Sequence, residues 1–319
     1  MPKYLKELNA IRNEIKKAVI GQDDVINGLL RAILANGHVL IEGVPGIAKT
    51  LLIRSLAASV GCSFSRIQFT VDLLPSDITG MTTYTKGKGF DVIKGPIFSN
   101  FIIADEINRS PPKTQSALLE AMQEKQATIG KTTYKLKRPF FVMANNNPLE
   151  SSGVYPLPEA QIDRFLFKLK MEYPSELEVM DIIENNMTLK KFEDFKIRPV
   201  VSGKTILEMQ EYTKKIKHTE KIKEYIVKIA FATRFPEKYN ISSGKYIDWG
   251  ISPRGEIGLF IAAKADAVLN GQEYVTPQNV KNVAYDIMRH RLILNYQARA
   301  DRVSSEYIIS EILSKIDIP

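Results

Sequence analysis

A glycine-containing turn between an apolar stretch and an apolar-faced segment has the composition of a phosphate-binding loop. The turn reads Gly-Val-Pro-Gly-Ile-Ala-Lys-Thr over residues 43–50 and follows an apolar stretch at residues 38–41. Glycine lets several backbone N–H groups point at one anion, while lysine reaches the outer phosphates and a threonine hydroxyl can ligate magnesium. The residues predicted to bind the ligand here are Gly43, Val44, Pro45, Gly46, Ile47, Ala48, Lys49, Thr50 and Leu51.

One position departs from the strict pattern of such loops. Ala48 occupies the place of the second glycine. This residue should open the following helix, so we expect a negative φ and little cost from the added methyl group. A chance match in an ordinary strand–turn–helix unit is the alternative interpretation.

Two adjacent carboxylates, Asp105 and Glu106, end a second apolar stretch that begins at Phe101. A strand that ends in this way brings both acids to the edge of the sheet where the phosphate loop lies. Neighbouring residues on a strand point in opposite directions, so the two acids cannot have the same role. We expect Asp105 to hold magnesium through water and Glu106 to orient and deprotonate the attacking water.

Three further polar positions could contact the phosphates. An apolar stretch leads into three asparagines and a proline at residues 145–148, whose amides could bind a phosphate or water, although a plain turn has the same composition. Arg164 could stabilise phosphoryl transfer on a neighbouring subunit, or simply pair with Asp163 or Glu159. Arg254 could reach the phosphates bound by its own chain, or be one of many solvated arginines.

The elements that must position these side chains alternate between strands and helices. Four of five predicted strands are nearly continuous apolar runs, which is typical of a parallel sheet covered by helices on both faces. The fifth, at residues 66–70, is mixed and fits an edge strand. The predicted strands are residues 38–42, 66–70, 101–104, 139–144 and 165–169.

Two segments between these elements predict hairpins. Residues 72–95 are rich in glycine and threonine and too long for a plain loop, so we expect an inserted hairpin with its tip near residues 86–89. Residues 128–137 predict a second hairpin that turns at residues 130–131.

A turn that follows the first predicted helix, residues 4–18, lies just ahead of the phosphate loop in the chain. Its apolar pair, Val19 and Ile20, could hold a base ring together with Gly21 and Gln22. Helical periodicity alone would instead place the pair in the core.

The pattern after residue 174 predicts helices only. The predicted helices there include residues 203–217, 219–233, 253–270, 277–289 and 304–315. We therefore expect two domains, an α/β core over residues 1–195 and an α-helical lid over residues 196–319.

Composition narrows the protein class but not the function. The 319 residues are 44% hydrophobic and 25% charged, and no apolar run reaches the roughly 18–20 residues that span a bilayer. The first residues lack the apolar core of a signal peptide, and a single cysteine, Cys62, allows no internal disulfide, so we expect a cytoplasmic protein. The net charge of +8 permits an acidic partner or nucleic acid without indicating one.

The order of these motifs resembles the MoxR family of AAA+ ATPases. The resemblance covers nearly the whole chain, and its motifs are Gln68–Thr70, Leu73–Gly80, Gly95–Phe98, Ala104–Arg109, Lys113–Glu124, Leu157–Phe165, Ser252–Arg254, Tyr274–Pro277 and Arg289–Arg291. It implies an α/β core with an insertion in helix 2, an α-helical lid, binding of ATP and Mg²⁺, and assembly into a ring, usually a hexamer.

The resemblance also implies roles for individual residues. Residues 145–148 depart from the Thr-Gln-Asn-Pro that is usual in the family but retain its asparagine. The implied set is Lys49 and Thr50 of Walker A, Asp105 and Glu106 of Walker B, Asn147 as sensor 1, Arg164 as the arginine finger, Arg254 as sensor 2, and Val19 and Ile20 beside adenine.

The resemblance implies an ATP-hydrolysing, chaperone-like protein that remodels protein complexes or inserts metal cofactors, often with a von Willebrand factor A domain protein. Three alternatives remain: a nucleic-acid motor, a magnesium-chelatase-type motor subunit, and a scaffold that binds ATP without useful turnover. In a nucleic-acid motor, the lysines at positions 86, 88, 131, 135 and 137 could line a pore.

Overall fold

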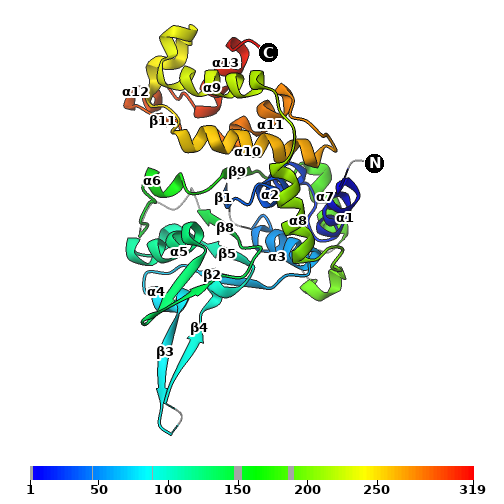
Figure 1. Ribbon diagram of the computed structural model, residues 1–319, viewed down its shortest axis with the longest axis vertical. Coiled ribbons are helices and arrows are strands. Elements are labelled where there is room, and N and C mark those ends of the chain that lie inside the picture. Colours follow the sequence, from blue (N-terminus) through cyan, green and yellow to red (C-terminus); the bar gives the residue numbers. More distant parts are fainter. Residues whose placement is uncertain (1–2, 45, 88, 147–152, 186–189) are drawn as a thin grey trace.

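The computed structural model describes residues 3–44, 46–87, 89–146, 153–185 and 190–319 (Figure 1). Its centre is a five-stranded parallel sheet with the order β2-β5-β8-β1-β9. The predicted parallel sheet is confirmed, and the mixed strand β2 lies at an edge, as expected. The strands are β1 (Val39–Gly43), β2 (Phe64–Gln68), β5 (Phe101–Asp105), β8 (Phe141–Asn146) and β9 (Phe167–Met171).

Helices cover both faces of this sheet, which explains the apolar runs. One face packs on α1 (Leu5–Lys16), α2 (Asp23–Leu34) and α3 (Lys49–Ser59) through side chains such as Ile41 and Ile103. The opposite face packs through Leu40, Ile102 and others on α4 (Pro75–Thr79) and α5 (Pro112–Glu124). Alternate residues of each strand are thus buried in different cores.

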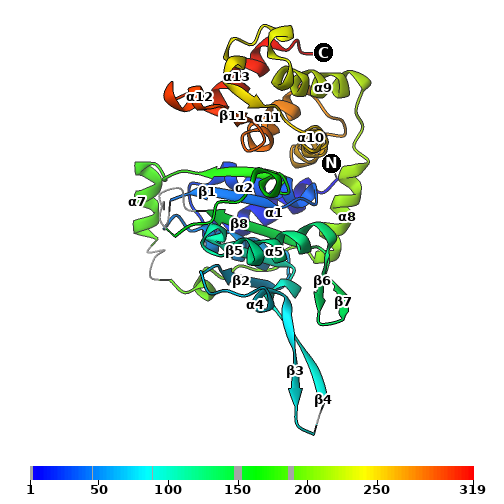
Figure 2. The same ribbon diagram turned by 90° about the vertical axis from the view of Figure 1, so that its left-hand side faces the viewer.

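Both predicted hairpins are present. The inserted hairpin consists of β3 (Gly80–Thr85) and β4 (Gly89–Lys94) and projects far from the body of the molecule (Figures 1 and 2). The second consists of β6 (Gln126–Ile129) and β7 (Thr132–Lys135).

The C-terminal half is mainly helical. The prediction of helices only after residue 174 was wrong in one respect, because β10 (Ile247–Trp249) and β11 (Ile293–Leu294) form a short antiparallel pair. None of the described helices is long and apolar enough to cross a membrane. The longer helices of this half are α7 (Glu176–Glu184), α8 (Gly203–Lys214), α9 (Glu220–Arg234), α10 (Pro253–Leu269), α11 (Pro277–Met288) and α13 (Ser305–Lys315).

A buried carboxylate connects the last helices to the sheet layer. Helix α10 packs on α2, and α11 packs on β9 (Figure 2). Asp266 of α10 has no exposed surface, and its Oδ1 accepts a hydrogen bond of 2.6 Å from Arg31 Nε of α2. Its Oδ2 accepts hydrogen bonds from the amides of Asn279 and Asn282 on α11. One side chain therefore joins three helices, and it is fully hydrogen-bonded.

We expect Asp266→Asn to lower the free energy of unfolding by about 3 kcal/mol, because it leaves the mostly buried Arg31 without its counter-charge. Asp23→Asn, which breaks an exposed ion pair with Lys16, should cost under about 1 kcal/mol. Urea denaturation followed by circular dichroism would measure both changes. Equal, small losses would show that the buried pair does not hold the two halves together.

Candidate nucleotide-binding site

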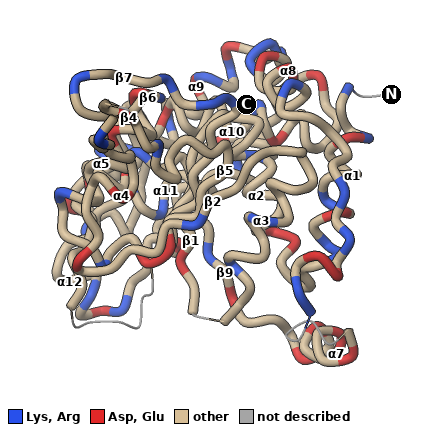
Figure 3. Tube along the Cα trace, turned by 90° about the horizontal axis from the view of Figure 1, so that it is seen from below, with Lys and Arg blue, Asp and Glu red and all other residues tan. Residues whose placement is uncertain are grey.

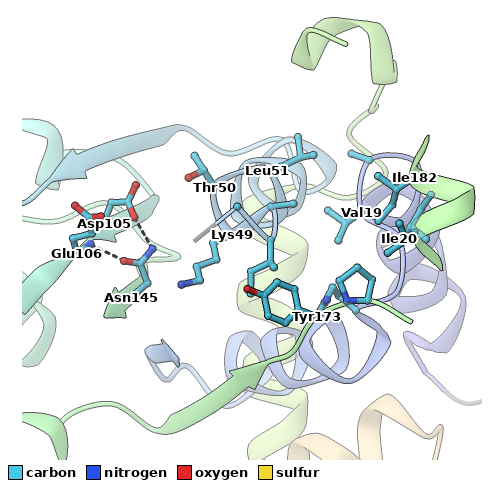
Figure 4. Close-up of a pocket in the computed structure, with 17 residues that line it drawn as sticks. Val19, Ile20, Lys49, Thr50, Leu51, Asp105, Glu106, Asn145, Tyr173 and Ile182 are labelled. Atoms are coloured by element: carbon cyan, nitrogen blue, oxygen red, sulfur yellow. Dashed lines mark hydrogen bonds between the residues drawn. The ribbon is translucent and has the colours of Figure 1, made fainter. Parts of the chain in front are cut away.

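A cavity of about 730 Å³ lies where β1, β5 and β8 end, between the phosphate loop and α7 (Figure 4). It is large enough for a small-molecule ligand and has a polar end and an apolar end. Its lining residues are Ala18, Val19, Ile20, Gln22, Gly46, Ile47, Ala48, Lys49, Thr50, Leu51, Asp105, Glu106, Asn145, Tyr173, Pro174, Val179 and Ile182.

Lys49 lies at the polar end, at the start of α3. Its ammonium group donates a hydrogen bond to the carbonyl of Gly43, the last residue of β1. Burial lowers the pKa of Lys49, while the nearby carboxylates of Asp105, Glu106 and Glu42 act in the opposite direction. An anion in the cavity would add negative charge beside this ammonium and stabilise its charged form.

The expectation of a negative φ at Ala48 was wrong. Ala48 has φ +62° and ψ +26°, a left-handed conformation directly before the first residue of α3. The chain must reverse there for α3 to begin at the loop, and this conformation is the reason why glycine is common at the position. In this conformation the Ala48 methyl group destabilises the loop by roughly 1–2 kcal/mol through steric contact.

Asn145 connects the two acids at the end of β5 (Figure 4). Its amide Nδ2 donates to Asp105 Oδ1, and its Oδ1 accepts from the backbone N–H of Glu106, both at 2.6 Å. Glu106 also has a left-handed backbone conformation, with φ +56°. This conformation turns its side chain away from the line of the strand. Such conformations cluster at functional sites, where surrounding contacts hold them.

Residues of β2 hold the side chains of both acids. Arg66 Nε donates to Asp105 Oδ2 at 2.9 Å, and Gln68 Nε2 donates to Glu106 Oε2 at 2.7 Å. Arg109 Nε also lies 3.2 Å from Glu106 Oε2. Sequence reasoning gave no site role to these three residues. The two-residue spacing of Arg66 and Gln68 indicated a shared face, but not that this strand would pair with β5.

Val19, Ile20 and Gln22 line the same cavity as the phosphate loop, at its apolar end. Sequence analysis missed its opposite wall, formed by Tyr173, Pro174, Val179 and Ile182. These residues lie more than 120 positions after the loop in the chain, and their apolar pattern indicated only helix packing.

Several predicted residues have other positions. Gly21, Gly43 and Val44 do not line the cavity; Gly21 packs against Glu178, and a Cβ on Gly43 would come within 2.6 Å of the Met171 carbonyl oxygen. At Gly21 and Gly43 the lack of a side chain therefore allows the neighbouring chain to pack closely. Pro45 and Asn147 lie outside the described residues.

Among the described residues that line this cavity, neither Arg164 nor Arg254 is present. Arg254 Nη1 is 3.3 Å from Asp163 Oδ2, so the structure does not support the expectation that it reaches the phosphates bound by its own chain. Helix α10 packs on α2, and Arg291, which follows α11, donates to Asp163 Oδ1 at 2.6 Å, so the start of the lid is held at Asp163. Arg164 lies beside these groups, against α5, and within the described residues it pairs with neither Asp163 nor Glu159.

Comparisons with known proteins agree with this geometry. Residues 38–167 match the model of the ATPase family associated with various cellular activities (AAA), and residues 242–312 match that of the AAA lid domain. The chain is 44% identical over 308 residues to the chaperone MoxR1 of Mycobacterium tuberculosis, covering 96% of this chain and 81% of the relative. It is 29% identical to MoxR of Methylorubrum extorquens, covering 92% and 90%.

The chain belongs to the MoxR family of AAA+ ATPases. A crystal structure of a protein from Cytophaga hutchinsonii that is assigned as an ATPase has a TM-score of 0.93 and 47% identity, covering 99% of this chain and 96% of that one. The predicted fold, an AAA+ core with a helical lid, is therefore confirmed, and this MoxR-family chain is an ATPase that binds a nucleotide.

We expect Ala48→Gly to raise the free energy of unfolding by up to about 1 kcal/mol, because glycine adopts the left-handed conformation without steric cost. Ala58→Gly, inside α3, should lower it by about 1 kcal/mol through loss of helix propensity. Paired denaturation curves would measure the difference. If both substitutions destabilise the protein equally, position 48 is not strained.

Proposed function

We propose that this protein binds and hydrolyses Mg-ATP in the cavity at the end of β1, β5 and β8. The proposal rests on one observation: phosphate-loop residues such as Lys49 and Thr50, the acids Asp105 and Glu106, and an apolar end that could hold a base all belong to one cavity. The triphosphate would lie along the start of α3, where the helix N-terminus favours an anion.

The donor set fits magnesium. The Thr50 hydroxyl and the Asp105 carboxylate are hard oxygen donors, and both line the polar end of the cavity. Magnesium commonly uses few protein ligands and completes its shell with water and phosphate oxygens, so Thr50 would bind it directly and Asp105 through water. The ion would neutralise charge on the phosphates.

Glu106 is the proposed general base. Its carboxylate would accept a proton from the attacking water, while Gln68 and Arg109 hold the side chain in place. Asn145 holds the backbone N–H of Glu106 and the Asp105 carboxylate, so it is a positioning residue for both acids. The role of Asn147 as sensor 1 remains a prediction.

Arg164 and Arg254 support hydrolysis between subunits of a ring. Both lie around Asp163, away from the cavity of their own chain, so they would serve the cavity of a neighbouring copy. The arginine charge would match the charge that spreads over the phosphate oxygens during transfer. We propose a homo-oligomeric ring, in keeping with the hexamer that is usual in the family.

The proposed output is chaperone-like remodelling of protein complexes or insertion of a metal cofactor. The name of the Mycobacterium tuberculosis relative, chaperone MoxR1, supports this class. The projecting β3–β4 hairpin exposes Tyr84 and Phe90, whose ring centroids lie 5.2 Å apart, as a contact for a protein client. Residues 1–195 and 196–319 would move as core and lid, and a von Willebrand factor A domain protein is a proposed partner.

Glu106→Gln should bind ATP with nearly unchanged affinity, while turnover falls by about 10²–10⁴, because the amide cannot accept the proton. Glu224→Gln, an exposed change on α9, is the matched control and should retain activity. Phosphate release and fluorescent-nucleotide binding would separate the two effects. Near-normal turnover of Glu106→Gln would refute the proposed base.

Arg164→Ala and Lys49→Ala should each be inactive alone, and their mixture should regain part of the ATPase activity. In mixed rings an intact Arg164 can act on the intact cavity of a neighbour. The control is the double variant Lys49→Ala, Arg164→Ala mixed with Arg164→Ala at the same ratio, in which no subunit has an intact Arg164 and no recovery is expected. Absence of recovery in rings shown to be mixed by native mass spectrometry would place Arg164 outside the reaction.

A further inference from the structure

Helix α7 presents an apolar face to solvent. None of its residues is buried, and Leu177, Met180 and Ile183 are 74%, 61% and 72% exposed. Their spacing of three residues places them along one side of the helix. On the other side, Val179 and Ile182 line the nucleotide cavity. An exposed apolar face of this kind marks an interaction surface more often than a free one.

The same helix is strongly acidic. It has no lysine or arginine, and its acids are Glu176, Glu178, Asp181 and Glu184. Only Glu178 has a local role, because it caps the start of the helix with Ser175. Within the described residues, the other three form no ion pair. A partner for α7 should therefore combine apolar surface with positive charge.

A groove of about 600 Å³ on the opposite side of the molecule has this combination. It lies between the end of α2 and helices α8, α9 and α10, and its surface is mainly apolar. Its apolar side chains include Ile226, Val227, Ile257, Phe260 and Ile261, and its lysines are Lys214, Lys223 and Lys264.

Lys264 is the most informative residue of this groove. It is only 8% exposed, and burial lowers its pKa. Its ammonium group donates to the Lys214 carbonyl oxygen at 2.9 Å and lies 4.7 Å from the centre of the Phe260 ring, with no carboxylate partner among the described residues. The one acid of the groove, Glu256, is paired with Arg234. A nearly buried cation without a counter-charge favours an acidic occupant.

We propose that α7 of one copy docks into this groove of the next copy in the ring. Leu177, Met180 and Ile183 would pack on the apolar lining, and the α7 acids would meet Lys264 and the other lysines. Figure 2 shows α7 and α8 on opposite sides of the molecule, and Figure 3 shows acidic residues on α7. Two different complementary surfaces form a head-to-tail contact, which closes into a ring when its rotation allows.

The inference rests on the ring assembly of the proposed function and adds a specific contact to it. A helix of nine residues is only part of a stable interface, which buries about 800 Å² on each partner. The proposed contact gives α7 two partners: the nucleotide through Val179 and Ile182, and the lid of a neighbouring copy through its outer face. Nucleotide binding and assembly would therefore be coupled through this helix.

Crosslinking between copies tests the contact directly. In a Cys62→Ala background, protein with Ile183→Cys is mixed with protein with Ile257→Cys, ATP and a short bismaleimide, with Glu106→Gln in both to prevent turnover. We expect a covalent dimer in this mixture. The control replaces the groove cysteine with Tyr296→Cys, which is 85% exposed on α12 (Tyr296–Ala300) outside the groove, and should give little dimer.

Substitution on the exposed face provides an independent measurement. Met180→Gln combined with Ile183→Gln should weaken ATP-dependent assembly at least about 10-fold in sedimentation velocity, because both side chains are central to the contact. Tyr296→Gln should leave assembly unchanged. Both substituted α7 positions are exposed, so the fold and ATP binding by the monomer should be retained, which circular dichroism and nucleotide titration would check.

The outcomes separate this inference from the proposed function. If wild-type protein forms rings, but the cysteine pair gives no more dimer than its control and the α7 variant assembles normally, the docking is wrong and the ring stands. If wild-type protein stays monomeric with Mg-ATP, the ring itself is refuted. If Ile257→Glu assembles normally but loses binding to a protein client, the groove is a client site and the assignment to α7 is overturned.

Discussion

Parallel pairing of β1, β5 and β8 is the constraint on which the site depends. The three strands are in register, with Ala144 of β8 opposite both Leu40 of β1 and Ala104 of β5. Their carboxyl ends therefore meet at one edge, where one strand leads into the phosphate loop, one into the acid pair and one into the asparagines. Burial of both faces by helices keeps this register, because a slip by one residue would expose half of each core.

Two strained residues line the same cavity, one directly before helix α3 and one directly after strand β5. Ala48 and Glu106 both have positive φ, and in each case the neighbouring structure holds the conformation: α3 begins directly after Ala48, and Asn145 accepts the backbone N–H of Glu106. Strain of this kind is retained where a fixed geometry is useful. Here it would hold the phosphate loop and the proposed general base in position before a ligand is bound.

The lid lies beside the sheet and not over the nucleotide cavity. Asp266 joins it to α2, and Asp163 accepts from Arg291 and Arg254, so polar contacts in two places hold α10 and α11 against the core. The consequence is a cavity whose lining lacks an arginine from its own lid within the described residues. In the proposed ring, hydrolysis would depend on groups from another copy, and the proposed contact between the acidic helix α7 and the lysine-containing groove would bring that copy into place.

Most of the fold was predictable because its signals are local. Continuous apolar runs, a glycine-containing turn and proline at the first position of α10 and α11 indicate their elements without knowledge of distant residues. The short β10–β11 pair was missed, since two or three residues of strand have no period to detect. At the site, Lys49, Thr50, Asp105 and Glu106 follow from motif and spacing, whereas the contribution of Asn145 could not be told apart from that of its neighbours.

The amino-acid order by itself determined which groups are candidates for phosphate chemistry, since each of those groups lies in a short segment whose backbone form is specified locally. Tertiary structure decided which groups meet. Gln68 contacts Glu106 because β2 pairs with β5. Tyr173 forms the far wall of the cavity because β9 ends beside β1. Arg254 contacts Asp163 because α10 packs on α2. These contacts depend on strand order and helix packing, which are properties of the whole chain.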